Sequence, residues 1–598
     1  MYFAAGDHTL FGWLHWPAAG ATASMGVVIC KPFGFEAVSS HQSVRAFAEA
    51  AASSGFPTLR FDYVGTGDSD DLEPNANQLV AWTADVTAAV RELQRRAGVT
   101  RVVLLGFRLG ALLATLAASE LDSVTALIVV APILSGKRYL GELRTIELVA
   151  AQRMALETSG PAPEGGPVSP DAPFEANGFP LAAATLAALA AVNLTALSVP
   201  PVCDLLVLDR NDLPTARAWC DQMLALGVRV RYQAPAGFIE MMMRGPERTV
   251  VPTAMIAAVG EWLGSLEAGR VQLPDCSDGS PCERIPNSPG TEVLQLAAGA
   301  ELLTERPVFF GSDPLRFGIV TEPPRREIRR RGVILVNSGA DYHVGPRRMH
   351  VSLARRWSRH GYVVLRMDLT GLGDSGRGPG RPANELFPPE AVADIRAALE
   401  FMRDRYGIGD TTLGGMCSGA YHSLRAAIEG LPVNRILMIN PLTFFQEEAL
   451  EPEEVQTWEI VHTPRAYRAH VSSPQFWRRL LSGNVNFRRA LKIGLGSLFL
   501  GLQSKLRGIA RRARIPLPRD LARDLARIAA RGTRIVFVFS RGDPGIGLLE
   551  LHSGASLEQL GERYRVRIVD GADHNLTRSG PRSKLEDVLS EELFAPNA

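Results

Sequence analysis

The chain has 598 residues, of which 46% are hydrophobic and 21% charged, and these values predict a globular protein of roughly two to four domains. The net charge of +1 and the lack of a recognition motif exclude a general affinity for nucleic acid. No apolar run approaches the roughly 18 residues that span a bilayer, and the first residues lack the basic segment of a signal peptide. We therefore expect a cytoplasmic protein.

Short apolar runs of buried-strand type alternate with segments of helical spacing along the chain. This alternation predicts a mostly parallel, doubly wound α/β sheet with helices on both faces. The segments on which the prediction depends are, in chain order, 27–29, 79–93 (helix), 102–105, 206–208, 333–335, 390–402 (helix), 435–439 and 537–539.

The two halves of the chain repeat the same motifs in the same order. The segment RFDYVGTGDS, from Arg60 to Ser69, returns 306 residues later as RMDLTGLGDS, from Arg366 to Ser375. A period near 300 residues indicates duplicated domains and not a solenoid, whose repeats are about 20 to 50 residues long. We predict two tandem domains, at 1–266 and 291–598, joined by a linker at 267–290 that is rich in Pro, Ser, Gly and Asp.

A second repeated motif carries the chemistry. The segments GFRLG at 106–110 and GMCSG at 415–419 both fit the frame G-x-S-x-G of a nucleophile elbow, a sharp strand-to-helix turn that exposes its central side chain. Neither segment has serine at its centre, because the first has Arg108 and the second has Cys417. A thiolate is a nucleophile, whereas a guanidinium is always protonated and is not one. The reaction is therefore expected in the second half.

On these motifs, both halves resemble the α/β-hydrolase superfamily, which implies a helical lid inserted in each domain, at about 134–200 and about 442–530. The family's order of nucleophile, acid and base implies the triad Cys417, Asp543 and His574. The cysteine-centred elbow is similar to those of dienelactone hydrolases and polyhydroxyalkanoate synthases. Both halves also resemble the small hydrolases associated with exosortase and polysaccharide clusters, one type of which has arginine in its elbow.

The first half departs from the triad at two of its three positions. Arg108 replaces the nucleophile and Phe238 stands where His574 stands in the second half, so that only Asp212 is retained. We expect this half to be catalytically inert. Two roles for Arg108 stay open: a site for an anion at a helix N-terminus, or a salt bridge to a neighbouring acid such as Asp212.

The predicted triad defines a mechanism. His574 takes the thiol proton or stabilises the thiolate as an ion pair, and Asp543 orients the imidazole. The oxyanion of the intermediate is expected to face backbone N–H groups, one from Ser418 and one from Gly339 or Ala340. No metal and no cofactor are required.

The sequence leaves several alternatives open. Cys417 could be a packed core residue, Ser418 could be the nucleophile, and Asp573 could replace Asp543 as the orienting acid. His343 lies in the predicted oxyanion loop, where it either contacts the substrate or has a structural role. The pair Asp374 and Ser375, like its counterpart in the first half, is expected to cap a turn.

Cysteine in the elbow favours acyl transfer or release from an acyl thioester, because attack on a thioester costs little free energy and leaves the acyl group activated. The expected partners are a thioester donor, on CoA or a carrier protein, and a small-molecule acceptor, in a biosynthetic pathway. The alternatives are an ester or lactone hydrolase of the dienelactone type and a non-catalytic scaffold of two domains.

The insertion of the second half is basic. Residues 465–514 contain twelve Lys or Arg and no Asp or Glu, with aromatic residues interleaved. A basic lid suits an acidic partner such as CoA phosphates, a carrier protein or an anionic membrane surface, and Trp477, Arg478 and Arg479 are the predicted contacts. The alternative is a solvated cationic face that is balanced by acidic residues such as those at 447–454.

Overall fold

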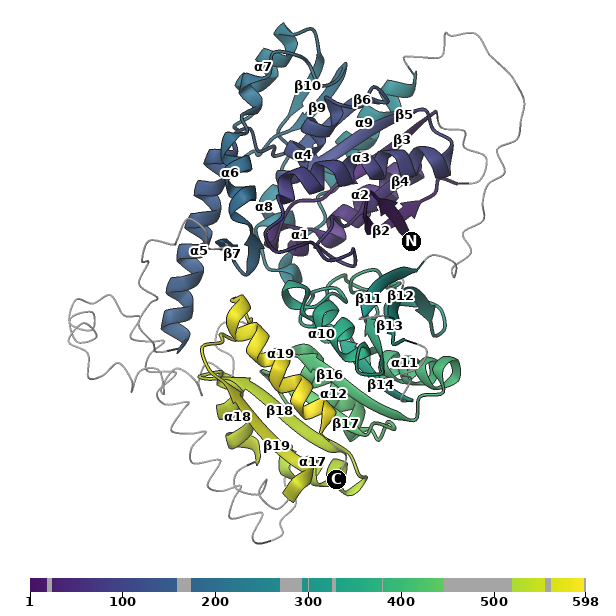
Figure 1. Ribbon diagram of the computed structural model, residues 1–598, viewed down its shortest axis with the longest axis vertical. Coiled ribbons are helices and arrows are strands. Elements are labelled where there is room, and N and C mark those ends of the chain that lie inside the picture. Colours follow the sequence, from purple (N-terminus) through teal and green to yellow (C-terminus); the bar gives the residue numbers. More distant parts are fainter. Residues whose placement is uncertain are drawn as a thin grey trace, which may run out of the picture. The chain divides into compact units, whose positions relative to one another are not determined.

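The computed structural model describes residues 1–18, 24–158, 174–268, 293–298, 301–324, 330–378, 380–445, 513, 519–553 and 561–595 (Figure 1). The chain forms two compact units, which consist mainly of Met1–Ala297 and Phe309–Ala598. Short pieces depart from this division, because Val149–Gly165 and Ala298–Leu303 group with the second unit and Thr304–Val308 with the first. Most of the predicted linker lies outside the described residues.

The first unit contains an eight-stranded sheet in the described residues, with the order β1-β2-β4-β3-β5-β6-β9-β10. β2 pairs antiparallel with β1 and β4, and the other neighbours are parallel. The strands are β1 (Tyr2–Ala5), β2 (His8–His15), β3 (Met25–Cys30), β4 (Thr58–Phe61), β5 (Arg101–Phe107), β6 (Val124–Val130), β9 (Asp204–Leu208) and β10 (Arg229–Gln233).

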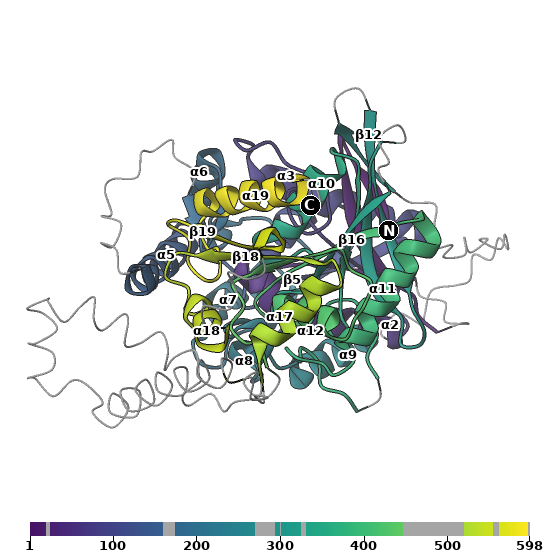
Figure 2. The same cartoon turned by 90° about the horizontal axis from the view of Figure 1, so that it is seen from below.

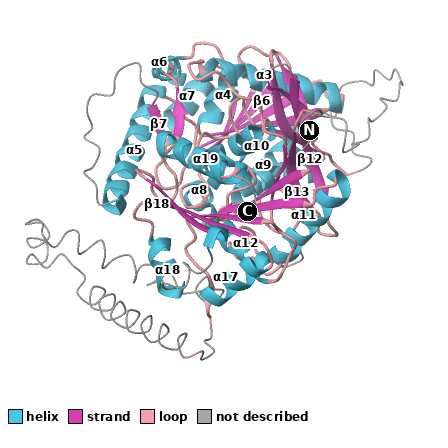
Figure 3. Ribbon diagram, turned by 60° about the horizontal axis from the view of Figure 1, so that its bottom comes forward, coloured by secondary structure: helices cyan, strands magenta, loops and turns pink. Residues whose placement is uncertain are grey.

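Helices cover both faces of this sheet (Figure 3). On each face, apolar side chains of the strands and helices form a separate cluster. Trp82 of α3 and Leu112 of α4 belong to one cluster, and Phe47 of α2 and Trp262 of α9 belong to the other. The helices are α1 (Phe35–Ser39), α2 (His41–Ser53), α3 (Gln78–Ala97), α4 (Leu109–Ala118), α7 (Arg217–Ala225), α8 (Phe238–Met242) and α9 (Thr253–Ala268), with the 3-10 turn η2 (Pro246–Arg248).

The second unit repeats the strand order of the first. Its sheet runs β12-β13-β15-β14-β16-β17-β18-β19, with β11 added at the edge beside β12. The strands are β11 (Leu294–Ala298), β12 (Glu301–Phe310), β13 (Arg316–Glu322), β14 (Arg331–Val336), β15 (Tyr362–Met367), β16 (Asp410–Met416), β17 (Arg435–Ile439), β18 (Arg534–Ser540) and β19 (Tyr564–Val569). This shared order confirms the predicted duplication of a doubly wound α/β domain.

In the second unit, α10 and α19 lie on one face of the sheet, and α11, α12 and α17 lie on the other (Figure 2). The helices are α10 (Met349–Ser358), α11 (Ala391–Tyr406), α12 (Ser418–Ile428), α17 (Leu521–Ala530), α18 (Pro544–Ser553) and α19 (Ser579–Phe594), with the 3-10 turn η3 (Pro346–Arg348). The strand predicted at 435–439 and the helices predicted at 79–93 and 390–402 are confirmed as β17, α3 and α11.

The insertion of the first unit contains α5 (Gly136–Thr158), β7 (Phe174–Ala176), β8 (Phe179–Leu181), α6 (Ala183–Ala191) and the 3-10 turn η1 (Leu194–Ala196). In the second unit, most of the basic insertion lies outside the described residues, and so do Trp477, Arg478 and Arg479. Among the described helices, none combines the length and hydropathy needed to cross a bilayer.

The repeated segments 60–69 and 366–375 have the same structural role in each half. Ser375 Oγ donates to the carbonyl oxygen of Asp368 at 2.7 Å and accepts the N–H of Phe317 at 2.8 Å, as Ser69 does with its own neighbours in the first half. Gly373 has a φ of +50°, and a Cβ there would lie 2.2 Å from Asp368 Oδ2. Only glycine fits this turn, so the motif defines the fold and not the reaction.

In each half, a buried aspartate of the following helix binds the repeated turn, but the two aspartates differ in their ion pairs. Asp85 Oδ2 accepts the N–H of Val64 at 2.8 Å, and Asp394 Oδ2 accepts the N–H of Thr370 at 2.7 Å. Asp394 also pairs with Arg316 at 2.7 Å. Burial raises the pKa of Asp85 from 3.8 to about 7, although its hydrogen bond from Val64 opposes this shift.

The raised pKa of Asp85 makes the stability of the first unit depend on pH. Between pH 3.8 and about 7, the folded carboxyl holds a proton that the unfolded chain releases, so stability falls as the pH rises through this window. Asp85→Asn, which does not titrate, should match the wild type near pH 3.8 and be more stable above pH 7 by up to about 4 kcal/mol. Urea midpoints at both pH values check this, and an equal difference at both would contradict it.

Candidate functional site

Cys417 lies at the sharp turn between β16 and α12, as the elbow motif predicts. Its φ of 53° and ψ of −111° are almost those of Arg108 between β5 and α4, where φ is 52° and ψ is −116°. A Cβ on Gly415 would lie 2.4 Å from the backbone of Gly419, and one on Gly419 would lie 2.4 Å from the carbonyl oxygen of Asn337. The two glycines therefore allow the strand and the helix to approach closely enough to hold this strained turn.

The acid and the base of the predicted triad are in contact. His574 Nδ1 lies 2.6 Å from Asp543 Oδ2, and the N–H of Gly545 donates to Asp543 Oδ1 at 2.8 Å. The carboxylate of Asp543 has no exposed surface, whereas 17% of the His574 side chain is exposed. A shielded acid therefore holds an imidazole that solvent and ligands can reach.

Cys417 lies close enough to the ring of His574 to act on its pKa, so the elbow and the pair of acid and base belong to one site. Burial by itself lowers the pKa of His574, but the carboxylate of Asp543 and, after it, Cys417 outweigh burial and raise the pKa well above 6.5. A protonated imidazole beside a sulfur atom stabilises a thiolate, which is the nucleophilic form of cysteine.

Two alternative assignments do not fit the geometry. Ser418 is buried and its Oγ accepts the N–H of Gly339 at 2.9 Å, so its hydroxyl points into the loop and not toward a substrate. Asp573 accepts two hydrogen bonds from Thr577, from the N–H at 2.7 Å and from the hydroxyl at 2.6 Å. Asp573 thus caps a turn, and Asp543 is the residue that orients His574.

The contact of Ser418 also refines the predicted oxyanion hole. Because the N–H of Gly339 is bound to Ser418 Oγ, it is not available to an oxyanion in this conformation. Among the hydrogen bonds of the described residues, none uses the N–H of Ser418 or of Ala340. These two groups, at the start of α12 and in the loop after β14, are the remaining donors of the predicted set.

The geometry does not support a contact between His343 and the substrate. The side chain has no exposed surface, and its Nδ1 lies 2.8 Å from Asp368 Oδ2. In the first half, Lys31 Nζ lies 2.5 Å from Asp62 Oδ1, the counterpart of Asp368. In both halves, a basic side chain thus partners the same buried aspartate, which is a structural role.

His343, Asp368 and Asp374 have ligand atoms within 4.8 Å of one another, as a metal site would. However, Asp368 already accepts hydrogen bonds from Asn337 Nδ2 and from the N–H groups of His343 and Asp374. Because the repeated turn needs these bonds, we assign the cluster to the fold.

Arg108 is held by two carboxylates in the first unit. Its Nε donates to Glu36 at 2.9 Å and its Nη2 donates to Glu142 at 2.6 Å, and the guanidinium is nearly buried. A cavity of about 350 Å³ lies beside it, lined in part by Tyr139 and Glu142. Of the two roles left open by the sequence, the geometry supports the salt bridge, but Asp212 is not the partner.

The other two positions of the degenerate triad have also changed role. Asp212 is exposed and pairs with Arg210 at 2.5 Å. Phe238 is fully buried in the apolar cluster under α8 and α9. At these three positions the first unit keeps the elbow but has neither a nucleophile nor a base, and its inertness stays a prediction.

One residue beside the triad has no motif in the sequence. Asn440 follows β17, is fully buried, and its side chain donates to the carbonyl oxygen of His574 at 2.9 Å. The corresponding position in the first half is Ala131. Aligning the two halves of the sequence position by position would have identified Asn440, because its counterpart has no polar side chain.

Comparisons with known proteins match each half of the chain to a family model of the α/β-hydrolase superfamily. The family model described as "Serine aminopeptidase, S33" matches residues 37–163, and the model described as "Alpha/beta hydrolase family" matches residues 333–586. No curated protein sequence gives a significant match.

Similar solved structures include Est1E from Butyrivibrio proteoclasticus with ferulic acid bound, at 18% identity and a TM-score of 0.32, covering 45% of this chain and 99% of that chain. Proline iminopeptidase from Mycobacterium smegmatis has 16% identity and a TM-score of 0.30, covering 45% of this chain and 99% of that chain. Alpha/beta hydrolase domain-containing protein 10 from mouse has 15% identity and a TM-score of 0.29, covering 44% of this chain and 98% of that chain.

Proposed function

Because the chain belongs to the α/β-hydrolase superfamily, with one such domain in each half, we propose that it is an enzyme whose second domain forms an acyl-enzyme on Cys417. The observation that carries this proposal is the contact of Asp543 with His574, whose pKa Cys417 helps to raise from a strained elbow. We further propose that the acyl donor is a thioester of CoA or of a carrier protein.

The first half of the reaction loads the enzyme. The thiolate of Cys417 attacks the carbonyl carbon of the donor, and the new C–S bond places negative charge on the carbonyl oxygen. The N–H groups of Ser418 and Ala340 are suited to stabilise this charge. When the intermediate collapses, the donor thiolate leaves and takes the proton of His574.

The second half of the reaction releases the acyl group. Neutral His574 takes a proton from the acceptor, which is water or a small molecule, as the acceptor attacks the acyl carbon. The C–S bond to Cys417 breaks, the sulfur leaves as thiolate, and the imidazolium re-forms beside it. Asp543 keeps the ring in place and stabilises its charge in both halves.

Cysteine favours a thioester donor over an ordinary ester, because one thioester is exchanged for another at little cost. The basic segment at 465–514 favours an acidic donor, such as the phosphates of CoA or a carrier protein, and a membrane surface with anionic headgroups is a further candidate contact. Lactone hydrolysis of the dienelactone type would use the same three residues.

Turnover of matched substrates tests the proposal. We expect hydrolysis or transfer of acyl-CoA and acyl-pantetheine donors, and faster alkylation of Cys417 by iodoacetamide than of the exposed Cys203. Turnover of small lactones without use of any thioester would replace the thioester donor with a lactone. If Cys417 were no more reactive than Cys203 and nothing were turned over, the chain would instead be a scaffold of two domains.

A further inference from the structure

We infer that Asn440 is a positioning residue for the catalytic base: its side-chain amide, together with Ser540, fixes the loop that carries His574. This inference rests on the proposed role of Cys417 and His574. It adds a residue that neither the family motif nor the triad geometry identifies.

The amide of Asn440 joins the ends of three segments. Its Oδ1 accepts the N–H of Ser540, the last residue of β18, at 2.8 Å. Its Nδ2 donates to Ser540 Oγ at 3.0 Å and to the carbonyl oxygen of His574 at 2.9 Å. Ser540 Oγ in turn donates to the carbonyl oxygen of Asp573 at 2.9 Å. Two consecutive carbonyl groups of the histidine loop are thus bound, one directly and one through Ser540.

This network is shielded from water. Asn440 has no exposed surface and Ser540 is 1% exposed, so neither side chain can exchange its partners for solvent. A buried amide that uses both its donor and its acceptor groups holds one geometry, because any shift would leave a polar group unsatisfied. The backbone at His574 is therefore fixed by Asn440 and Ser540, and its imidazole ring is fixed by Asp543.

The first unit provides a comparison within the same molecule. Ala131 follows β6 as Asn440 follows β17, and the two residues share a positive φ, at 45° and 44°. Each donates its N–H to the next parallel strand, to Leu208 at 2.9 Å and to Val538 at 3.1 Å. The fold thus needs the backbone geometry in both halves, but the amide occurs only where a catalytic histidine is present.

The corresponding loop of the first unit folds without a side-chain amide at the position of Asn440. Where His574 stands in the second unit, the first has Phe238, which is held by apolar packing and begins α8. Removal of the amide should therefore alter the placement of the base more than the stability of the fold. A displacement of catalytic groups of about 1 Å costs on the order of 100-fold in rate.

The test is the rate at which iodoacetamide alkylates Cys417 in the full-length protein, followed by peptide mass spectrometry with Cys203 as internal reference. Asn440→Gly removes the amide and tolerates the positive φ. We expect it to slow alkylation of Cys417 by about 10- to 100-fold, and to cause no further slowing in a His574→Ala background. Ala131→Gly is the matched control and should leave the rate unchanged.

Three results would overturn the inference, and they differ in what else they affect. If His574→Ala slows alkylation but Asn440→Gly does not, the amide of Asn440 does not position His574, and the proposed function stands. If Asn440→Gly slows alkylation equally with and without His574, its effect is general and not exerted through the base. If His574→Ala has no effect, there is no base to position and the proposed function fails too. If Asn440→Gly does not fold, Ser540→Ala replaces it in the test. This smaller change should slow alkylation of Cys417 less, and again only when His574 is present; no slowing would overturn the inference.

Discussion

Replacement of Cys417 by alanine is expected to reduce turnover of a thioester donor by at least about 10⁴-fold, because no other group at the elbow can form the acyl-enzyme. The neighbouring hydroxyl of Ser418 cannot substitute, since it is buried and bound to the N–H of Gly339. Binding of the donor should be retained, since the substitution removes only the sulfur atom. Steady-state kinetics and calorimetric titration with a non-hydrolysable CoA analogue measure the two quantities.

The duplicated chain supplies a control for this result. Asp543→Ala should lower turnover by about 10³- to 10⁴-fold, because the imidazole loses the partner that holds and charges it. Asp212→Ala removes the corresponding acid of the first half, which is exposed and forms an ion pair with Arg210, and should leave turnover unchanged. Equal losses in both variants would mean that the first half takes part in the reaction.

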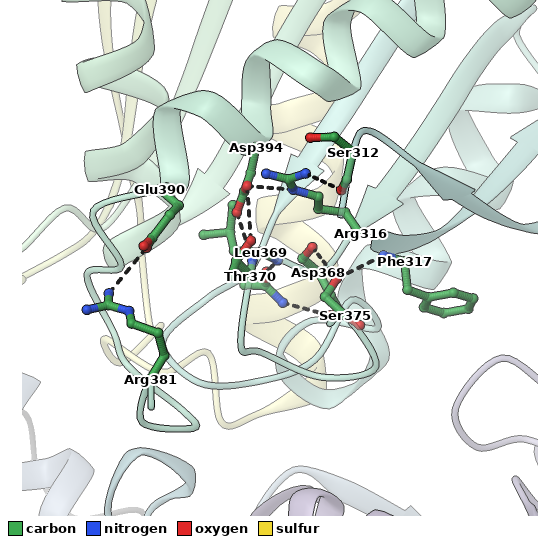
Figure 4. Close-up of polar contacts among 11 residues, drawn as sticks. Ser312, Arg316, Phe317, Asp368, Leu369, Thr370, Ser375, Arg381, Glu390 and Asp394 are labelled. Carbon is green, nitrogen blue, oxygen red and sulfur yellow. Dashed lines mark hydrogen bonds and ion pairs between the residues drawn. The ribbon is translucent and has the colours of Figure 1, made fainter. Parts of the chain in front are cut away.

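The second large effect concerns stability. Asp394→Ala is expected to lower the unfolding free energy of the second unit by about 3 to 5 kcal/mol, because it leaves the nearly buried guanidinium of Arg316 without its counter-charge. Figure 4 shows that Asp394 also binds Thr370, through the N–H at 2.7 Å and the hydroxyl at 3.1 Å, beside the turn at Asp368. Within the described part of the chain, Arg316 would then keep one hydrogen bond, to the carbonyl oxygen of Ser312.

Because a chain of two domains need not unfold in one step, the loss should be measured by hydrogen exchange in peptides from each half. We expect loss of protection in peptides from 310–440 and no change in peptides from 25–130. Asp404→Ala, which breaks an exposed pair with Arg403, is the control and should change nothing measurable. Unchanged protection in the Asp394→Ala protein would show that the buried pair does not stabilise the domain.

Each member of the proposed triad has a local signal in the sequence. Cys417 lies between the two glycines that the elbow requires, Asp543 follows a strand that the repeat marks, and His574 ends a short turn after the last strand. The duplication strengthened each signal, because the same frame occurs twice. The fold was predictable for the same reason, since strand and helix periodicity recur in both halves.

The remaining contacts depend on the tertiary structure. The partners of Arg108 lie 72 and 34 residues away in the sequence, so no local pattern could favour Glu36 and Glu142 over Asp212, the acid that the triad frame suggested. His343 lies in a polar loop that suggested a contact with substrate, but the fold turns it onto Asp368. Which backbone N–H faces an oxyanion depends on the turn after β14, where Gly339 binds the hydroxyl of Ser418.

The central claim is that Cys417 carries the acyl group. The most direct measurement is the intact mass of the wild type and of Cys417→Ala after incubation with a panel of acyl-CoA and acyl-pantetheine donors. We predict an added mass equal to one acyl group in the wild type alone, located by peptide mapping at Cys417. An adduct of the same size in Cys417→Ala, or turnover of a donor by that variant at the wild-type rate, would contradict the account.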